Sequence, residues 1–240
     1  MNNELTSELR KVSFQYKLFE GVPKAGVVCL GELADTEVAR DVATQFQTHY
    51  RVEKLRHAGS LAFQRAAHRI VGINIANWML TGCVFEFSDR ATWLHMEHGA
   101  TTAISVADIT TRSISAAQTT EYAFGLIQPL VYSFHIATGV GVANLKGNIA
   151  ATIGAAVRNV GRKHPSLDST ALGNTLLRAD PTLEKLGWFE ELQYGDKRAT
   201  VFYRNSCCHW YTTGAEHCDW CTHRGERRRR NFLADLRDSK

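Results

Sequence analysis

The sequence has no long hydrophobic run. No apolar stretch reaches the roughly 20 residues that a membrane-spanning helix requires. The first residues, Met1 to Leu5, are largely polar and lack the basic and then apolar layout of a secretory signal. We therefore expect a cytoplasmic protein without a membrane span.

Motifs for nucleotide binding and for serine hydrolase chemistry are also missing. Gly139-Val140-Gly141 is too short for the glycine fingerprint of a dinucleotide-binding fold, and there is no phosphate-binding loop. No Gly-x-Ser-x-Gly pattern occurs either. The chain thus has no visible site for its own nicotinamide or flavin, and any electrons that it uses must come from a separate carrier.

What is present is an ordinary globular composition. Hydrophobic residues make up 44% of the 240 residues and charged residues 22%, which is enough apolar material for a real core. The net charge of +4 is only mildly basic and is not by itself a nucleic-acid signature. Five arginines gather near the end, Arg224 and Arg227 to Arg230. They fit a solvated helical face, a surface for an acidic protein or an anionic ligand, or a nucleic-acid contact.

The first half of the chain predicts two helices and a small sheet. Asp35-Thr36 is a capping signal for a helix over about 36–50, and Ser60 is a capping signal for a second helix over about 61–80. The segments 84–87 and 92–96 read as a β-hairpin, and residues 103–106 read as a third short strand.

Helical periodicity returns from about residue 116. A further helix is expected over about 142–161, Asp168 should cap a short helix to about 178, and Asp180-Pro181 should open another. Residues 199–203 look like a strand that leads directly into a cysteine cluster. The expected fold is therefore mainly α with a small β-hairpin or short antiparallel sheet (α+β), with a helical body over 1–198 and a metal-binding tail over 199–240.

Four of the six cysteines fall within 15 residues of the tail. Cys29 and Cys83 are isolated in apolar contexts, which indicates structural roles. In a reducing cytoplasm a close cluster favours a metal over disulfides. The Gly214 turn lies between two pairs and lets the chain fold back; the four candidate ligands are Cys207, Cys208, Cys218 and Cys221.

The adjacency of Cys207 and Cys208 bears on which metal is bound. Neighbouring side chains in an extended segment point to opposite faces, so a single zinc ion would need a local bend to use both. Structural zinc sites usually carry two C-x(2–4)-C knuckles instead. A two-iron cluster is a larger object with four terminal thiolate positions. The spacing favours iron–sulfur, while zinc and disulfides stay open.

This cysteine pattern resembles a known family. Arg204-Asn205-Ser206-Cys207-Cys208 followed by Cys218-x-x-Cys221 is similar to the C-terminal signature of the FhuF-type ferric-siderophore reductases, C-C-x10-C-x2-C, which holds a [2Fe–2S] cluster. The spacer here is nine residues, one shorter than in the family. A weaker resemblance lies at residues 145–150, Leu-Lys-Gly-Asn-Ile-Ala, where the family has a tryptophan in place of Lys146.

The resemblance implies an oxidoreductase that acts on chelated iron. Its cluster would reduce the Fe(III) of a ferric siderophore to Fe(II), with a ferredoxin or a reductase as the electron donor. Two other functions stay open: a zinc-stabilised module that binds nucleic acid through the basic tail, and an iron–sulfur redox sensor without a substrate. His209, His217 and His223 flank the cysteines, and we expect them to act as neighbours of the sulfur atoms rather than as ligands.

Overall fold

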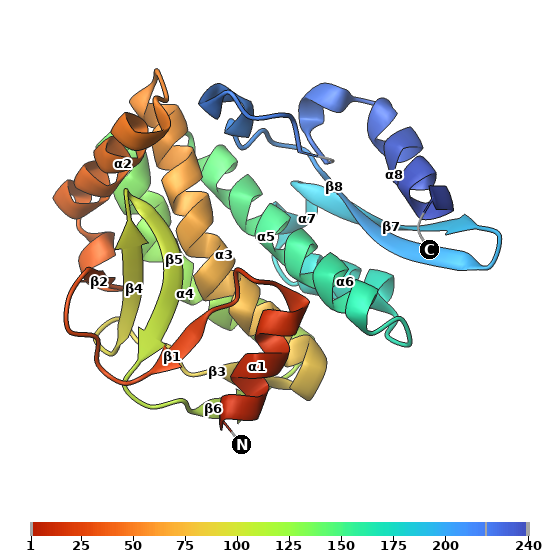
Figure 1. Ribbon diagram of the computed structural model, residues 1–240, viewed down its shortest axis with the longest axis horizontal. Coiled ribbons are helices and arrows are strands. Elements are labelled where there is room, and N and C mark those ends of the chain that lie inside the picture. The colour runs from red at the N-terminus through yellow and green to blue at the C-terminus, as the bar shows by residue number, and fades with distance from the viewer. Residues whose placement is uncertain (1, 219, 239–240) are drawn as a thin grey trace.

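The computed structural model describes residues 2–218 and 220–238, with the side chains of residues 2–5 left aside (Figure 1). It is 56% helical and contains eight α-helices and small sheets of two to four strands in this part of the chain. The predicted mainly helical α+β class is thus confirmed. None of the described helices is both long enough and apolar enough to cross a membrane.

Four long helices form the centre of the body. The longest, α3 (Leu55–Thr81), is buried on nearly all sides because α2 (Thr36–Tyr50), α4 (Ala116–Thr138), α5 (Val142–Lys163) and the sheet all pack against it. Figure 1 shows α3 in the middle of this group. The remaining helices are shorter: α1 (Asn2–Val12), α6 (Ser169–Arg178), α7 (Pro181–Glu184) and α8 (Arg227–Asp238).

Local capping signals placed several helices correctly. The Asp35 carboxylate accepts hydrogen bonds from the backbone N–H groups of Glu37 and Val38 at the start of α2. Asp168 caps α6 in the same way, and Asp180 caps α7. The predicted α5 is confirmed within two residues at its end.

The expected cap at Ser60 is wrong. Helix α3 begins at Leu55, with Lys54 at the N-cap and no side-chain capping bond. Ser60 lies inside the helix, fully buried, and donates a hydrogen bond to Asn144 Oδ1 at 2.6 Å. Burial against neighbouring helices, rather than a local cap, therefore sets where α3 begins.

The expected hairpin between residues 84–87 and 92–96 is also wrong. β3 (Cys83–Phe85) pairs with β6 (Thr111–Ser113), while β4 (Thr92–Glu97) forms its hairpin with β5 (Ala100–Val106). His98 and Gly99 make the two-residue turn, with φ values of 51° and 75°, as a tight hairpin requires. A Cβ atom at Gly99 would lie 2.3 Å from the carbonyl oxygen of Val42, so only glycine fits there.

Side chains bind the backbone that the expected hairpin would have paired. The N–H of Phe85 donates to Asn74 Oδ1 at 2.8 Å, and the N–H of Phe87 donates to the Tyr122 hydroxyl at 2.7 Å. These residues are thus held by α3 and α4. The third predicted strand is real and longer than expected, as β5. Its sheet also contains β1 (Leu18–Glu20) and β2 (Val27–Cys29), and β1 runs parallel to β5, so this sheet is mixed.

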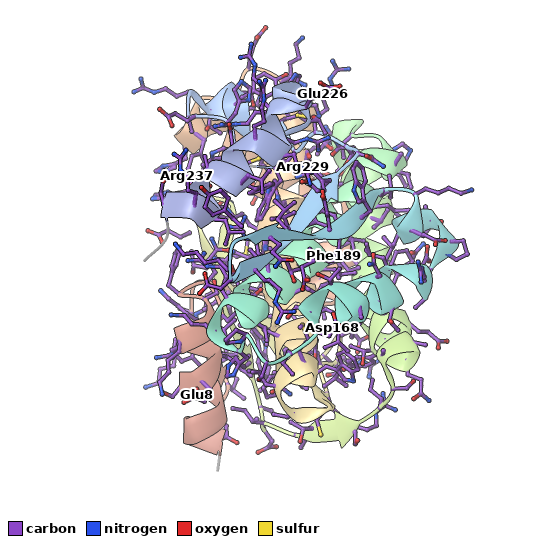
Figure 2. All side chains as sticks on the ribbon, turned by 90° about the vertical axis from the view of Figure 1, so that its right-hand side faces the viewer. Glu8, Asp168, Phe189, Glu226, Arg229 and Arg237 are labelled. Atoms are coloured by element: carbon purple, nitrogen blue, oxygen red, sulfur yellow. The ribbon has the colours of Figure 1, made fainter. Side chains whose placement is uncertain are left out.

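A second hairpin joins the body to the tail. The predicted strand is β8 (Lys197–Arg204), and its antiparallel partner β7 (Gly187–Tyr194) was not expected from the sequence. One face of the hairpin packs on α5, where Phe202 sits against Gly154. The other face packs on α8, in a small cluster of Leu192, Val201, Tyr203, Phe232 and Leu236. Figure 2 looks at this side of the molecule, with Arg229 on α8 and Phe189 on β7 labelled.

The proposed division at residue 198 falls inside β8, between residues that are paired with β7. Phe202 lies beyond this point and belongs to the main core. The separation of a helical body from a metal-binding tail stays a prediction, and any independent tail segment would begin after Arg204.

Candidate metal centre

The chain turns back on itself after β8 and brings the cysteines together. His209 adopts a left-handed conformation with φ 65°, and Gly214 does the same with φ 80°. Between them lies a short 3₁₀ turn, η2 (Trp210–Thr213), and a second one, η3 (Thr222–Arg224), follows Cys221. The turn expected at Gly214 is therefore present, and it returns the second cysteine pair towards the first.

The four tail thiols form one interacting group and no disulfide. Cys208 and Cys221 are buried, and Cys207 and Cys218 are half-buried. The Cys218 thiol hydrogen-bonds to Cys208, and the sulfur of Cys207 interacts electrostatically with Cys208 and Cys221. The other two cysteines lie elsewhere, Cys29 on β2 and Cys83 on β3.

The charge of these thiols is unevenly distributed. The hydrogen bond from Cys218 and the nearby Arg204 guanidinium lower the pKa of Cys208 well below its usual range. The pKa of Cys218 is raised in turn by its bond to Cys208 and by burial. Burial also raises the pKa of Cys207. Cys208 is thus the first of these three to become a thiolate, the form that binds metals.

Histidines contact two of the sulfur atoms. His223 Nε2 lies 3.5 Å from the Cys207 sulfur, and His217 Nδ1 lies 3.3 Å from the Cys221 sulfur. The backbone N–H of His209 donates to the Cys207 sulfur at 3.3 Å. These contacts agree with the expectation that the histidines neighbour the sulfur atoms.

A buried arginine lies beneath the cysteines. Arg204 is 1% exposed, and its Nη2 donates to Asn148 Oδ1 at 2.8 Å, while its Nε donates to the carbonyl oxygen of Ser206. Its Nη1 atom is buried without a hydrogen-bond partner. No acidic side chain in the described ranges forms an ion pair with it. A buried cation without a counter-charge is costly, so the site favours an anion next to Arg204.

The two segments that carry the family resemblance meet in space. Asn148 joins them, because its Oδ1 accepts a hydrogen bond from Arg204. Its Nδ2 donates to the carbonyl oxygen of Ser60 and so also ties the site to α3. Asn144 Nδ2 donates to the carbonyl oxygen of Cys207 at 2.6 Å. A Cβ atom at Gly147 would lie 1.8 Å from Ser206 Oγ, so a larger residue would displace the segment before Cys207. Helix α5 therefore positions the first cysteine pair.

Sequence reasoning missed Asn144, and it included Asn148 and Arg204 in the quoted motifs without predicting that they would bond to each other beside the cysteines. The spacing of Asn144 and Asn148, four residues apart on one face of α5, is a signal that could have found them. Arg204 ends an apolar strand, and nothing local marks it as buried.

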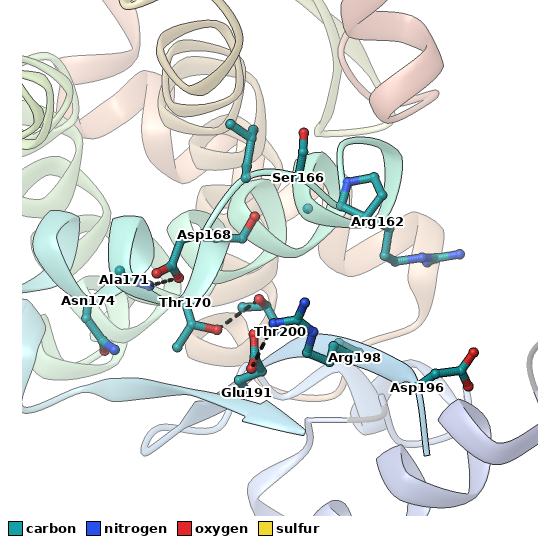
Figure 3. Close-up of a pocket in the computed structure, with 15 residues that line it drawn as sticks. Arg162, Ser166, Asp168, Thr170, Ala171, Asn174, Glu191, Asp196, Arg198 and Thr200 are labelled. Atoms are coloured by element: carbon teal, nitrogen blue, oxygen red, sulfur yellow. Dashed lines mark hydrogen bonds and ion pairs between the residues drawn. The ribbon is translucent and has the colours of Figure 1, made fainter. Parts of the chain in front are cut away.

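Two cavities lie near opposite ends of β8, and one of them borders the cysteines. One of about 250 Å³ opens beside Cys208 and Cys218, between the tail and α3. A larger one, about 830 Å³, lies between the start of α6 and the start of β8, with Asp168, Thr170 and Arg198 on its wall (Figure 3). The larger cavity is at the opposite end of β8 from the cysteines, so it does not face the thiols.

No family model matches the chain, and no curated protein matches it. The resemblance to the FhuF-type reductases therefore stays a prediction that rests on the residues quoted for it.

The donor set fits an iron–sulfur cluster in its chemistry. Four thiols would supply the terminal ligands that a [2Fe–2S] centre requires, and the positive charge of the buried Arg204 would match the negative charge of a thiolate-bound cluster. The fit is one of residue chemistry and not of arrangement, because in the part of the chain that the structure describes no three His, Cys, Asp or Glu side chains are placed as a ligand group for a metal ion.

Proposed function

We propose that this protein is a cytoplasmic ferric-siderophore reductase that carries a [2Fe–2S] cluster on Cys207, Cys208, Cys218 and Cys221. The observation that supports it most is the gathering of four thiols above Arg204, a buried cation that has no acidic partner in the described residues. Soft thiolates beside a fixed positive charge suit a redox centre that gains and loses one electron.

In the proposed reaction, the protein positions the cluster and the ferric chelate, and the electron transfer itself forms no covalent bond. When bound, the cluster supplies one electron at a time. The Fe(III) of the chelate gains that electron and becomes Fe(II), a softer and less charged ion that hard oxygen ligands hold far more weakly. The iron then leaves the chelator, and a ferredoxin or a reductase replaces the electron. Arg204, together with His223 beside Cys207 and His217 beside Cys221, would stabilise negative charge at the thiolates.

Anaerobic purification tests the cofactor. We expect a red-brown protein with about two irons and about two sulfides per chain. Cys221→Ser should abolish or alter the visible spectrum, because it removes a buried thiol of the group. Cys29→Ser is the matched control and should leave the spectrum unchanged, since Cys29 lies on β2. A colourless protein that contains zinc would contradict the proposal and support the zinc module.

A second experiment separates the reductase from a redox sensor. The reduced protein is mixed with ferric siderophores in the presence of a ferrous trap. We expect cluster reoxidation to match the ferrous iron trapped, one for one. A cluster that no ferric chelate reoxidises would favour the sensor.

A further inference from the structure

The cavity of about 250 Å³ beside Cys208 and Cys218 is lined by hydrogen-bond donors and aromatic rings. The polar side chains are Gln15, Gln64, Arg65 and His68, and the rings belong to Trp210 and Trp220. The rest of the wall is Leu61 and the thiols of Cys208 and Cys218, and no carboxylate of the described residues is part of it. A wall with donors and no carboxylate suits a ligand that is rich in oxygen acceptors and negatively charged.

Arg65 supplies the positive charge of this cavity. Its guanidinium lies over the Trp210 ring, 5.1 Å from the ring centre, and the side chain is half-buried. It forms no ion pair with any acid in the described ranges. Arg69, one turn further along α3, adds a second charge behind it. A partly buried cation is poorly screened by salt and attracts an anion strongly.

His68, which also lines the cavity, contributes a hydrogen-bonding group and no positive charge at neutral pH. Burial, followed by the charges of Arg69, Arg65 and Arg204, lowers the pKa of His68 to about 3. His68 therefore stays neutral and can donate or accept one hydrogen bond.

The cavity size limits what can enter. Sites that enclose a whole drug-sized ligand measure about 300–1,000 Å³. At about 250 Å³ this cavity suits one arm of a chelate, while the metal ion stays outside, near Cys208 and Cys218.

We propose that this cavity binds a carboxylate arm of an anionic, citrate-type ferric chelate, with Arg65 as the anchoring cation. The fork of N–H donors on a guanidinium matches a carboxylate with two parallel hydrogen bonds. This inference rests on the proposed function, because it names the substrate class of the same site.

Gallium(III) complexes test binding apart from reduction. Gallium(III) has the charge and the coordination chemistry of ferric iron but takes up no electron, so calorimetry with the intact holoprotein measures binding alone. The probes are gallium(III) citrate and a positively charged gallium(III) trishydroxamate. We expect the wild type to prefer the citrate complex, and Arg65→Gln to weaken that binding about tenfold or more, as the loss of a charge-assisted bond implies.

Arg56→Gln is the matched control, because Arg56 lies on the same helix, is exposed, and is not part of the cavity wall. It should bind the citrate complex as the wild type does. Equal binding by Arg65→Gln and the wild type, or a wild-type preference for the trishydroxamate, would overturn the inference.

The two proposals fail in different ways. If gallium(III) citrate binds through Arg65 but ferric citrate does not reoxidise the reduced cluster, the anion site is supported and the proposed reductase activity is contradicted. If other ferric chelates reoxidise the cluster but gallium(III) citrate does not bind through Arg65, the reductase activity is supported and the anion site is contradicted.

Discussion

Arg204 is the residue on which the electrostatics of the site depend most. Arg204→Met removes the cation but keeps a long apolar side chain. Reduction adds a negative charge next to the thiolates, so loss of the nearest positive charge should lower the midpoint potential of the cluster. We expect the equilibrium constant for reduction by a fixed donor to fall about tenfold, which corresponds to 59 mV for a one-electron couple.

A potentiometric titration followed in the visible spectrum measures this shift. Arg204→Lys keeps the charge and should shift the potential less, although it loses the paired bonds to Asn148 and Ser206. If Arg204→Met had the wild-type potential, Arg204 would not act as the counter-charge of the centre.

His68 makes the stability of the protein depend on pH. Its pKa is about 3 in the folded protein and 6.5 in an unfolded chain, so below 6.5 the unfolded state binds the extra proton. The contribution is fully present above 6.5 and is lost as the pH falls towards 3, by at most about 1.4 kcal/mol per pH unit.

Urea denaturation of the wild type and His68→Gln measures this contribution. Between about pH 7 and about pH 5, the wild type should lose more unfolding free energy than the variant, which has no group to protonate there. Parallel losses in the two proteins would show that His68 is not held neutral.

At the scale of elements, the contact between α5 and β8 holds the tail in place. A Cβ atom at Gly154 would lie 2.3 Å from the Phe202 ring, so Gly154→Ala should destabilise the protein by about 1–3 kcal/mol. Gly125→Ala in α4 is the matched control, since no atom lies within 4 Å of its added Cβ and helical alanine should gain about 0.5–1 kcal/mol. Opposite signs in urea denaturation are expected, and a gain for both variants would contradict close packing of α5 on β8.

What the sequence could predict follows from the range of each interaction. Helices α2 and α6 are capped by Asp35 and Asp168, whose carboxylates accept hydrogen bonds from backbone N–H groups within the next three residues. The local sequence pattern was therefore enough to predict where these helices start. Strand pairing is set at longer range: β3 takes β6 as its partner, across two intervening strands, and no local pattern reports that. The candidate site divides in the same way. Gly214 marks the turn that gathers the cysteines, whereas the bond from Arg204 to Asn148 spans 56 residues.

At the scale of the whole molecule, the tail contains two kinds of structure. Strands β7 and β8 are paired over their full length and packed between α5 and α8. Among its described residues, the segment from Asn205 to Glu226 has two short 3₁₀ turns and isolated backbone hydrogen bonds. Its order must depend more on side-chain contacts, and on whatever the four thiols bind.

Removal of the metal should therefore loosen this segment and leave the hairpin intact. After chelation under anaerobic conditions, amide hydrogen exchange should rise over residues 207–224, where few backbone bonds protect the chain. Residues 197–204 should stay protected, because β7 pairs with them and Phe202 lies in the main core. If exchange rose equally across β7 and β8, the hairpin and the cysteine segment would form one metal-dependent unit that begins near Gly187, before the expected division at residue 198. If neither region changed, the cysteine segment would owe its order to Arg204, Asn144 and Asn148 alone, and the thiols would not hold a structural metal.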